Sequence, residues 1–263
     1  MSKFKAIALS FIFVCQLSAQ PALGWRSNPR HAKSLKQFIH AAPQTIAPAS
    51  DLRSKMPPVY DQGQKGSCSA NAGAADFEAL WKQAHGSFLK VSRQGLYTCE
   101  LIHDGNWPSD EGSYTTSIIW VLKNQGVGTE KCFPYSKPVS APLPKCYLPD
   151  AAKHKLIDAY DVDNTDGTSI RAALTAGLPV VFGGYVYADI QRLQPPYILP
   201  SPKGRPIGGH EMTVVGHDDA KQIYTVRNSW GASWGDHGHL YIKYEDMHNP
   251  RIYEDFAAMK LTN

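Results

Sequence analysis

The sequence predicts an α+β protein in which a helical half precedes a β half. Apolar residues recur at helical spacing before about residue 155, and short runs typical of strands follow it. Helices first and strands later are typical of α+β folds rather than of alternating α/β folds. With 263 residues, 43% hydrophobic and 19% charged, the chain can bury the core of one compact unit or of two closely packed halves.

Two helices are predicted in the first half. One begins after Ser67, a residue type that favours the N-cap position, and ends near Gly86. Its apolar face is formed by Ala70, Ala74, Phe77, Leu80 and Trp81. The other covers about residues 115–124 and stops before Gly126. In the second half, strands are predicted at residues 179–187, 210–217, 223–227 and 240–244.

Residues 1–24 are predicted to be a signal peptide. Two lysines precede an apolar run over residues 6–14, and small residues allow cleavage after Ala19 or after Gly24. The alternative is a buried N-terminal helix. Neither this run nor any later stretch reaches the length that spans a bilayer. We therefore expect export to a periplasm or secretion, without stable membrane insertion.

Residues 25–50 are predicted to be a short basic leader, or pro-segment, ahead of a domain at residues 51–263. The segment holds four cations, three prolines and no acid, and residues 32–42 fit one short amphipathic helix. The formal charge of the whole chain is +4, whereas that of residues 51–263 alone is −2. Charges this small do not favour nucleic acid or an anionic membrane as a partner.

Four cysteines remain after the signal peptide, in a compartment that permits disulfides. If one is a free thiol, the other three form one disulfide and leave one unpaired. Cys132 and Cys146 flank a proline-rich loop and are the preferred pair, although other pairings stay open.

Cys68 is the candidate nucleophile. It stands where the flexible run of residues 62–67 enters a helix, and the positive end of the helix dipole favours a thiolate there. A buried structural cysteine or a disulfide partner is the alternative.

Two distant segments favour the catalytic interpretation. His210 begins an apolar strand after two glycines, 142 residues beyond Cys68. Asn228 ends a strand 18 residues later and precedes a turn rich in Gly and Trp. A lone histidine would more often be structural, but three such segments in this order indicate a Cys–His pair oriented by an amide.

These segments resemble the papain-like family of cysteine peptidases, and most of all its compact bacterial members. The matches are Gln62, Gly66-Ser67-Cys68, Gly209-His210 and Asn228-Ser229-Trp230-Gly231, within a similarity over residues 51–263. The resemblance implies two lobes, helical over about residues 51–155 and β-barrel-like over 156–263, with the active-site cleft between them.

The resemblance also implies a role for each matching residue. Cys68 would attack the substrate carbonyl as a thiolate paired with protonated His210. Asn228 would orient the histidine ring, and Trp230 would shield that bond from water. Gln62 would supply one N–H to the oxyanion hole, with the backbone N–H of Cys68 as the second donor.

Substrate contacts are assigned by the same resemblance. Gly112-Ser113-Tyr114 matches a glycine segment that pairs with extended substrates, although a plain loop is the alternative and Ser113 replaces a glycine. Gly66, Gly209 and Trp230 border the same cleft. Glu211 replaces a small residue beside the S2 pocket, so we hypothesise that it admits Arg or Lys at P2. The alternative is a carboxylate that points elsewhere or pairs with a cation.

The expected function is that of a monomeric cysteine endopeptidase acting on proteins or peptides, and the rival is a catalytically silent binding protein on the same fold. No cofactor or metal is expected, because the histidines lack the spacing of zinc motifs. Residues 25–50 are too few for a folded inhibitory domain. We expect them to lie across the cleft as an extended plug.

Overall fold

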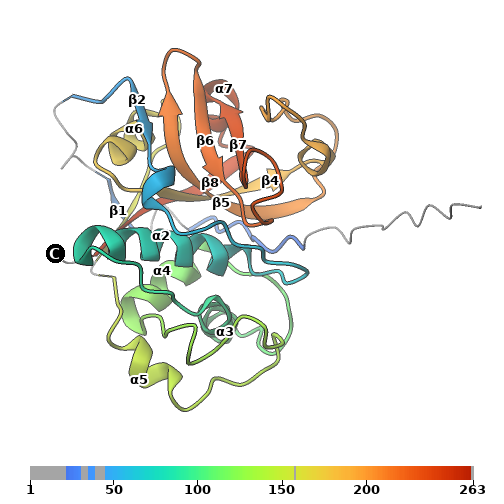
Figure 1. Ribbon diagram of the computed structural model, residues 1–263. Coiled ribbons are helices and arrows are strands. Elements are labelled where there is room, and N and C mark those ends of the chain that lie inside the picture. Colours follow the sequence, from blue (N-terminus) through green and yellow to red (C-terminus); the bar gives the residue numbers. More distant parts are fainter. Residues whose placement is uncertain (1–21, 31–34, 39–44, 157, 262–263) are drawn as a thin grey trace, which may run out of the picture.

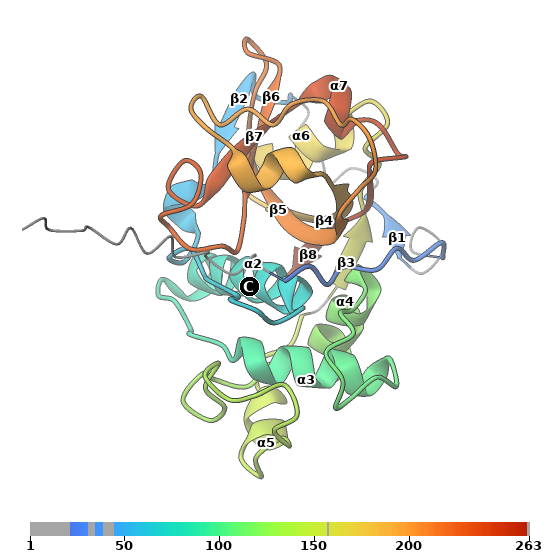
Figure 2. The same cartoon turned by 90° about the vertical axis from the view of Figure 1, so that its right-hand side faces the viewer.

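The computed structural model describes residues 22–30, 35–38, 45–156 and 158–261, which form a helical lobe and a β lobe (Figure 1). Helices α2 to α5 gather on one side and the sheet, with α6 and α7, on the other. Figure 2 shows α2 at the boundary between the lobes, where it packs against strand β5. The α+β prediction is confirmed.

The helical lobe contains four helices in the part of the chain that the structure describes. They are α2 (Cys68–His85), α3 (Arg93–His103), α4 (Thr115–Asn124) and α5 (Tyr147–Ala151). Both predicted helices are present, and Gly86 ends α2 in the left-handed conformation at φ 79°. Ser67 precedes α2 without a side-chain cap bond, because its hydroxyl pairs with that of Tyr135 at 2.6 Å.

The β lobe is one mixed sheet. Its strands are β1 (Lys36–Gln37), β2 (Ala49–Asp51), β3 (Asp158–Asp161), β4 (Val180–Val186), β5 (Gly208–Asp218), β6 (Ile223–Arg227), β7 (His239–Lys243) and β8 (Tyr253–Lys260). They lie in the order β1-β3-β8-β4-β5-β6-β7, with β2 paired to β5. Helices α6 (Thr168–Thr175) and α7 (Tyr244–Met247) flank it. The end strands β1 and β7 do not pair, so the described sheet is open rather than a closed barrel.

The leader contributes to this sheet. Lys36 and Gln37 pair in parallel with β3, so the helix expected at residues 32–42 is wrong at these two positions. Ala49–Asp51 pair antiparallel with β5. Residues 1–21, which include most of the expected signal peptide, lie outside the described residues.

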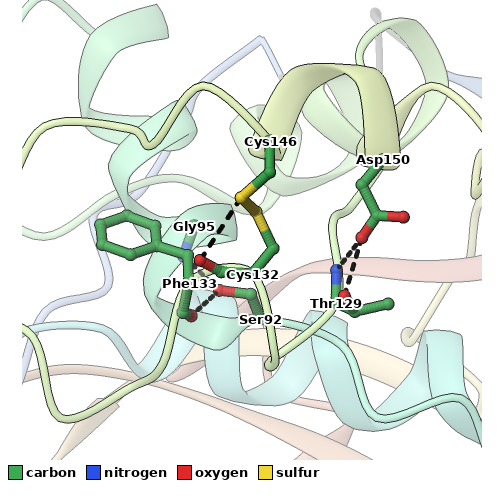
Figure 3. The surroundings of a disulfide bond; sticks show 7 residues. All are labelled: Ser92, Gly95, Thr129, Cys132, Phe133, Cys146 and Asp150. Carbon is green, nitrogen blue, oxygen red and sulfur yellow. Dashed lines mark hydrogen bonds between the residues drawn. A yellow bond between two sulfur atoms is a disulfide. The ribbon is translucent and has the colours of Figure 1, made fainter.

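Cys132 and Cys146 form a disulfide in the helical lobe, with their Cα atoms 6.1 Å apart (Figure 3). This is the pair that the sequence favoured. On one side of it Ser92 donates to the carbonyl of Phe133, and on the other Thr129 donates to Asp150. The disulfide thus closes the proline-rich loop, and the Ser92 bond ties the loop to the start of α3.

No helix among the described residues is long and apolar enough to cross a membrane.

Candidate active site

Cys68 is the first residue of α2 and is fully buried. It and Cys99 are the free thiols of the described chain. The backbone amide of Glu211 on β5 lies close enough to the Cys68 thiol to influence its pKa. The start of α2 and the start of β5 therefore meet at the lobe boundary, although they are far apart in sequence.

His210 belongs to β5 and is held by two residues that follow β6. Its Nε2 lies 2.8 Å from Oδ1 of Asn228, and its ring stacks on Trp230 with centroids 4.9 Å apart. Nδ1 of the ring is buried and has no hydrogen-bond partner among the described groups. The structure thus brings His210, Asn228 and Trp230 together, with Nδ1 left available to a thiol.

Burial sets the ionisation of the candidate pair in this structure. It raises the pKa of the Cys68 thiol to about 12, and the nearby Glu211 adds to the effect. It lowers the pKa of His210 to about 4, against a smaller opposing effect of Asn228. While the site is covered, burial therefore favours the neutral forms of the thiol and of the imidazole.

Gln62 is fixed by Ser229. The Ser229 hydroxyl donates to Oε1 of Gln62 at 2.6 Å, and the backbone N–H of Gln62 donates to the Ser229 carbonyl at 2.8 Å. Nε2 of Gln62 then donates to the carbonyls of Ala22 and Lys65, both at 2.9 Å. The expected oxyanion donor is therefore oriented and already engaged by a carbonyl oxygen. Ser229 stands in one of the family-like motifs, but the motif alone does not indicate its bond to Gln62.

Lys65 anchors the loop ahead of the nucleophile. Its Nζ donates to the side chain of Gln94 and to the carbonyls of Tyr135 and Lys137. Partial burial lowers the pKa of Lys65 to about 8, and the neighbouring Arg93 contributes. A lysine with three acceptors thus ties this loop to the helical lobe.

Residues 22–28, hereafter the covering segment, lie across the site between the two lobes (Figures 1 and 2). The backbone N–H of Ser113 donates to the Gly24 carbonyl at 2.8 Å, and the Ser113 carbonyl accepts from the backbone N–H of Arg26 at 2.9 Å. The N–H of Trp25 donates to the Gly209 carbonyl at 3.1 Å. The segment therefore forms a single parallel β-bridge, between Trp25 and Ser113.

Glycines permit this close approach. A Cβ on Gly24 would stand 1.8 Å from the Gly66 carbonyl oxygen, and one on Gly112 would stand 1.9 Å from the Gly24 carbonyl oxygen. The guanidinium of Arg26 lies over the Tyr114 ring, 4.9 Å from its centroid. Gly66, Gly112, Ser113, Tyr114 and Gly209 are thus all next to the covering segment.

Two acids secure the C-terminal end of the covering segment. Ser27 donates to Glu254 at 2.9 Å, and the backbone N–H of Asn28 donates to Asp255 at 3.1 Å. Both acids belong to β8. No sequence motif indicates this contact.

Glu211 is buried without a cation. Neither carboxyl oxygen has a hydrogen-bond partner within 3.5 Å or an ion pair among the described residues, although the Thr115 hydroxyl is near enough to influence the pKa. Burial raises its pKa well above the ordinary value, and the charges of Asp255 and Asp76 add to this, while Thr115 opposes it. Burying a carboxyl group without a partner is costly, so its place beside Cys68 favours a functional role for Glu211.

Within the described residues, no group of three or more His, Cys, Asp or Glu side chains could hold a metal ion. His217, for example, contacts Tyr244 and Asp219 instead.

Most of this chain aligns with proteins described as cysteine proteases. A family profile described as "Papain family cysteine protease" matches residues 46–259. "Probable cysteine protease RDL6" of Arabidopsis thaliana is 29% identical over 220 residues, which are 81% of this chain and 60% of the relative. "Chymopapain" of Carica papaya is 31% identical over 210 residues, 76% of this chain and 55% of the relative. The chain thus spans little more than half the length of these two proteins.

Solved structures agree. Xylellain, a cysteine protease from Xylella fastidiosa, superimposes with a TM-score of 0.81 and 27% identity, over 94% of this chain and 97% of xylellain. Digestive procathepsin L 3 of Tenebrio molitor shares the fold with a TM-score of 0.69 and 21% identity, over 88% and 75%. The sequence match over residues 46–259 and the architecture in common with xylellain show that the chain belongs to the papain family of cysteine proteases.

Proposed function

We propose that the protein is a cysteine endopeptidase that cleaves proteins or peptides with Cys68 as nucleophile and His210 as proton carrier. The bond between His210 Nε2 and Asn228 Oδ1 supports this most, because it fixes the ring and leaves Nδ1 for the thiol. Trp230 stacks on the His210 ring, Tyr114 lies beneath Arg26, and the Cys68 sulfur is buried. These features fit an enzyme site that excludes water.

The reaction proceeds in two stages once the cleft is open to water. Rehydration removes the burial that keeps both groups neutral, so the Cys68 proton passes to Nδ1 of His210. The thiolate sulfur attacks the carbonyl carbon, and the N–H donors of Gln62 and of the Cys68 backbone stabilise the oxyanion. The C–N bond breaks, and His210 gives its proton to the departing amine.

The second stage releases the acyl group. A water molecule attacks the thioester carbon while His210 accepts its proton, and the C–S bond then breaks. The carboxylic acid leaves, and the thiol is restored. Asn228 and Trp230 hold the ring throughout, which keeps Nδ1 directed at the sulfur.

The leader acts as the plug that keeps the enzyme inactive. Residues 22–28 engage Gln62, Ser113 and Gly209, the groups that a substrate would need. Cleavage of the signal peptide after Ala19 retains the whole plug, whereas cleavage after Gly24 would remove part of it. We therefore favour Ala19 as the end of the signal peptide of this exported protein.

Glu211 is the candidate determinant of specificity. Its preference for Arg or Lys at P2 stays a prediction, supported by the unpaired carboxyl group. Comparing substrates with Arg and Phe at P2 tests it, since a strong preference for Phe contradicts an acidic pocket.

Labelling with an epoxysuccinyl inhibitor tests the function. After the plug is removed, mass spectrometry should find one adduct, on the peptide that contains Cys68, together with loss of peptide hydrolysis. Cys68→Ser should abolish both labelling and hydrolysis. Cys99→Ser, which removes the other free thiol, should retain both. An unplugged protein that hydrolyses no peptide would instead favour the silent binding protein.

A further inference from the structure

The loop from Gln62 to Cys68 carries both proposed oxyanion donors. Nε2 of Gln62 lies at its start, and the backbone N–H of Cys68 lies at its end. The two N–H groups have to converge on one oxygen atom, so the distance between the two ends of the loop matters for catalysis. Ser229 holds the first donor. A different residue contacts both ends of the loop.

That residue is Tyr135 of the helical lobe. Its hydroxyl donates to the backbone carbonyl of Gln62 at 3.0 Å and lies 2.6 Å from the hydroxyl of Ser67. A phenol carries one hydrogen and a carbonyl oxygen can only accept it, so Ser67 is the donor in the second bond. Burial raises the pKa of Tyr135, which keeps the hydroxyl protonated. One hydroxyl therefore joins the residue of the first donor to the peptide unit that bears the second.

The hydrogen bonds continue behind Ser67. Nη1 of Arg93 donates to Oδ1 of Asn71 at 2.7 Å. Nδ2 of Asn71 then donates to the carbonyl of Ser67 at 2.8 Å and to its hydroxyl at 3.2 Å. The chain of bonds thus runs in one direction, beginning at the guanidinium of Arg93 and ending at the carbonyl of Gln62. Bonds aligned in this way polarise one another, and both Ser67 and Asn71 are buried from competing water.

The ring of Tyr135 is held by two cations. Cζ of Arg93 lies 3.8 Å from the ring centroid, and Nζ of Lys65 lies 4.0 Å from it. Arg93 also lies over the ring of Tyr60, 4.2 Å from its centroid, and Tyr60 packs against the core of the β lobe. The backbone N–H of Tyr135 donates to Glu130 at 2.9 Å. Contacts to both lobes therefore fix the place of the hydroxyl.

We propose that Tyr135 is a further positioning residue of the peptidase, which sets the spacing of the two oxyanion donors by bonding to Gln62 and to Ser67. The proposal rests on the proposed peptidase function. Tyr135 acts through the loop and not on the substrate. Its loss should therefore weaken stabilisation of the oxyanion, while substrate binding and the reactivity of the thiol stay nearly unchanged.

Tyr135→Phe tests the proposal, because it removes the hydroxyl and keeps the ring between its cations. In the unplugged enzyme, kcat for a fluorogenic peptide should fall about tenfold, with KM within about twofold of wild type. Alkylation of Cys68 by iodoacetamide expels iodide and forms no oxyanion, so its rate should stay within about twofold. Tyr160→Phe, which removes the hydroxyl of a tyrosine on β3, is the matched control and should change neither rate.

A double variant tests whether Tyr135 serves both donors. Gln62→Ala removes one donor and leaves the backbone N–H of Cys68. Tyr135→Phe should still lower kcat in that background, but by only about two- to threefold, because one positioned donor remains to be disturbed. No fall at all, or the full tenfold fall, would contradict a hydroxyl that places both donors.

The two reactions separate the possible failures. Titration with the epoxysuccinyl inhibitor first corrects each variant for misfolded protein. An unchanged kcat in Tyr135→Phe would overturn the proposal and leave the peptidase function unaffected. Equal falls in kcat and in alkylation would also overturn it, because the hydroxyl would then support the nucleophile and not the oxyanion donors. An unplugged wild-type protein that is alkylated at Cys68 but hydrolyses no peptide would reject the peptidase function, and the proposal with it.

Discussion

The Ser229 hydroxyl donates a 2.6 Å hydrogen bond to Oε1 of Gln62, joining the turn after β6 to the loop before α2. Both side chains are buried. Because the bond occupies the amide oxygen, it directs Nε2 toward the place where a carbonyl oxygen is bound, at present that of Ala22. The donor is therefore oriented before any substrate arrives, which is the condition for effective oxyanion stabilisation.

Replacing Ser229 by alanine should lower kcat of the unplugged enzyme by about tenfold with little change in KM, because Gln62 loses its orientation. Gln62→Ala should lower kcat by about 100- to 1,000-fold. The double variant should be no slower than Gln62→Ala alone, since both changes act on one donor. Steady-state kinetics measure all three, and additive losses would show that Ser229 acts in some other way.

Gly24→Ala should displace the covering segment, because the new methyl group would stand 1.8 Å from the Gly66 carbonyl oxygen. Peptide hydrolysis and Cys68 alkylation by the full-length chain should both rise about tenfold or more, as expected when a steric clash costs about 1–3 kcal/mol. Arg30→Ala changes an exposed residue of the same leader and should leave both rates unaltered. Matching rates for the two variants would contradict a plug at Gly24.

Lys65→Met should destabilise the fold by about 1–3 kcal/mol, because two backbone carbonyls and the Gln94 amide lose a charged donor. The free energy of unfolding in urea measures the effect. Lys137→Met, at an exposed lysine of the same region, is the control and should change it by less than about 0.5 kcal/mol. A wild-type value for Lys65→Met would mean that the loop holds without this anchor.

Asp76 should make stability depend on pH. Its carboxyl group is buried with no hydrogen-bond partner within 3.5 Å among the described residues, and burial raises its pKa to about 8 against smaller opposing effects of Thr213 and Arg227. The folded state therefore binds the proton more tightly than the unfolded state, so this contribution is complete below about pH 4 and is lost as the pH rises toward 8.

Asp76→Asn should remove that dependence. The free energy of unfolding, measured in urea at about pH 5 and about pH 7, should fall less with rising pH in Asp76→Asn than in wild type, by roughly 1 kcal/mol per pH unit. Asp189→Asn, at an exposed position, should retain the wild-type slope. If Asp76→Asn also retains it, Asp76 is not the buried acid that titrates in this range.

Sequence patterns predicted some elements to the residue and missed others for physical reasons. Thr115–Asn124 and Ile223–Arg227 were predictable because their apolar patterns are regular and end at clear breaks. Helix α3 was missed because it buries Gln94, Thr98 and Glu100, which interrupt any apolar stripe. Helix propensity and apolar periodicity do not record tertiary contacts. They therefore cannot predict a helix that buries polar side chains.

The candidate site also contains residues that the sequence indicates and contacts that it does not. Cys68, His210, Asn228 and Gln62 were identified because each stands in a short local motif. The contacts of Trp25 could not be predicted, since no local pattern records that a leader residue meets β4 and β5. Burial of Cys68 and His210 beneath the covering segment, which favours their neutral forms, is likewise recorded in no local pattern.

Strand β2 joins the leader to the strand that carries His210, whereas residues 22–28 occupy the groove through a few hydrogen bonds and one anchored side chain. A cut that frees the groove and keeps both leader strands in the sheet must fall between residue 28 and β1 at Lys36. Maturation would then release the peptide that contains residues 22–28. The strands that the leader adds to the sheet would stay in place, together with the strand that positions His210.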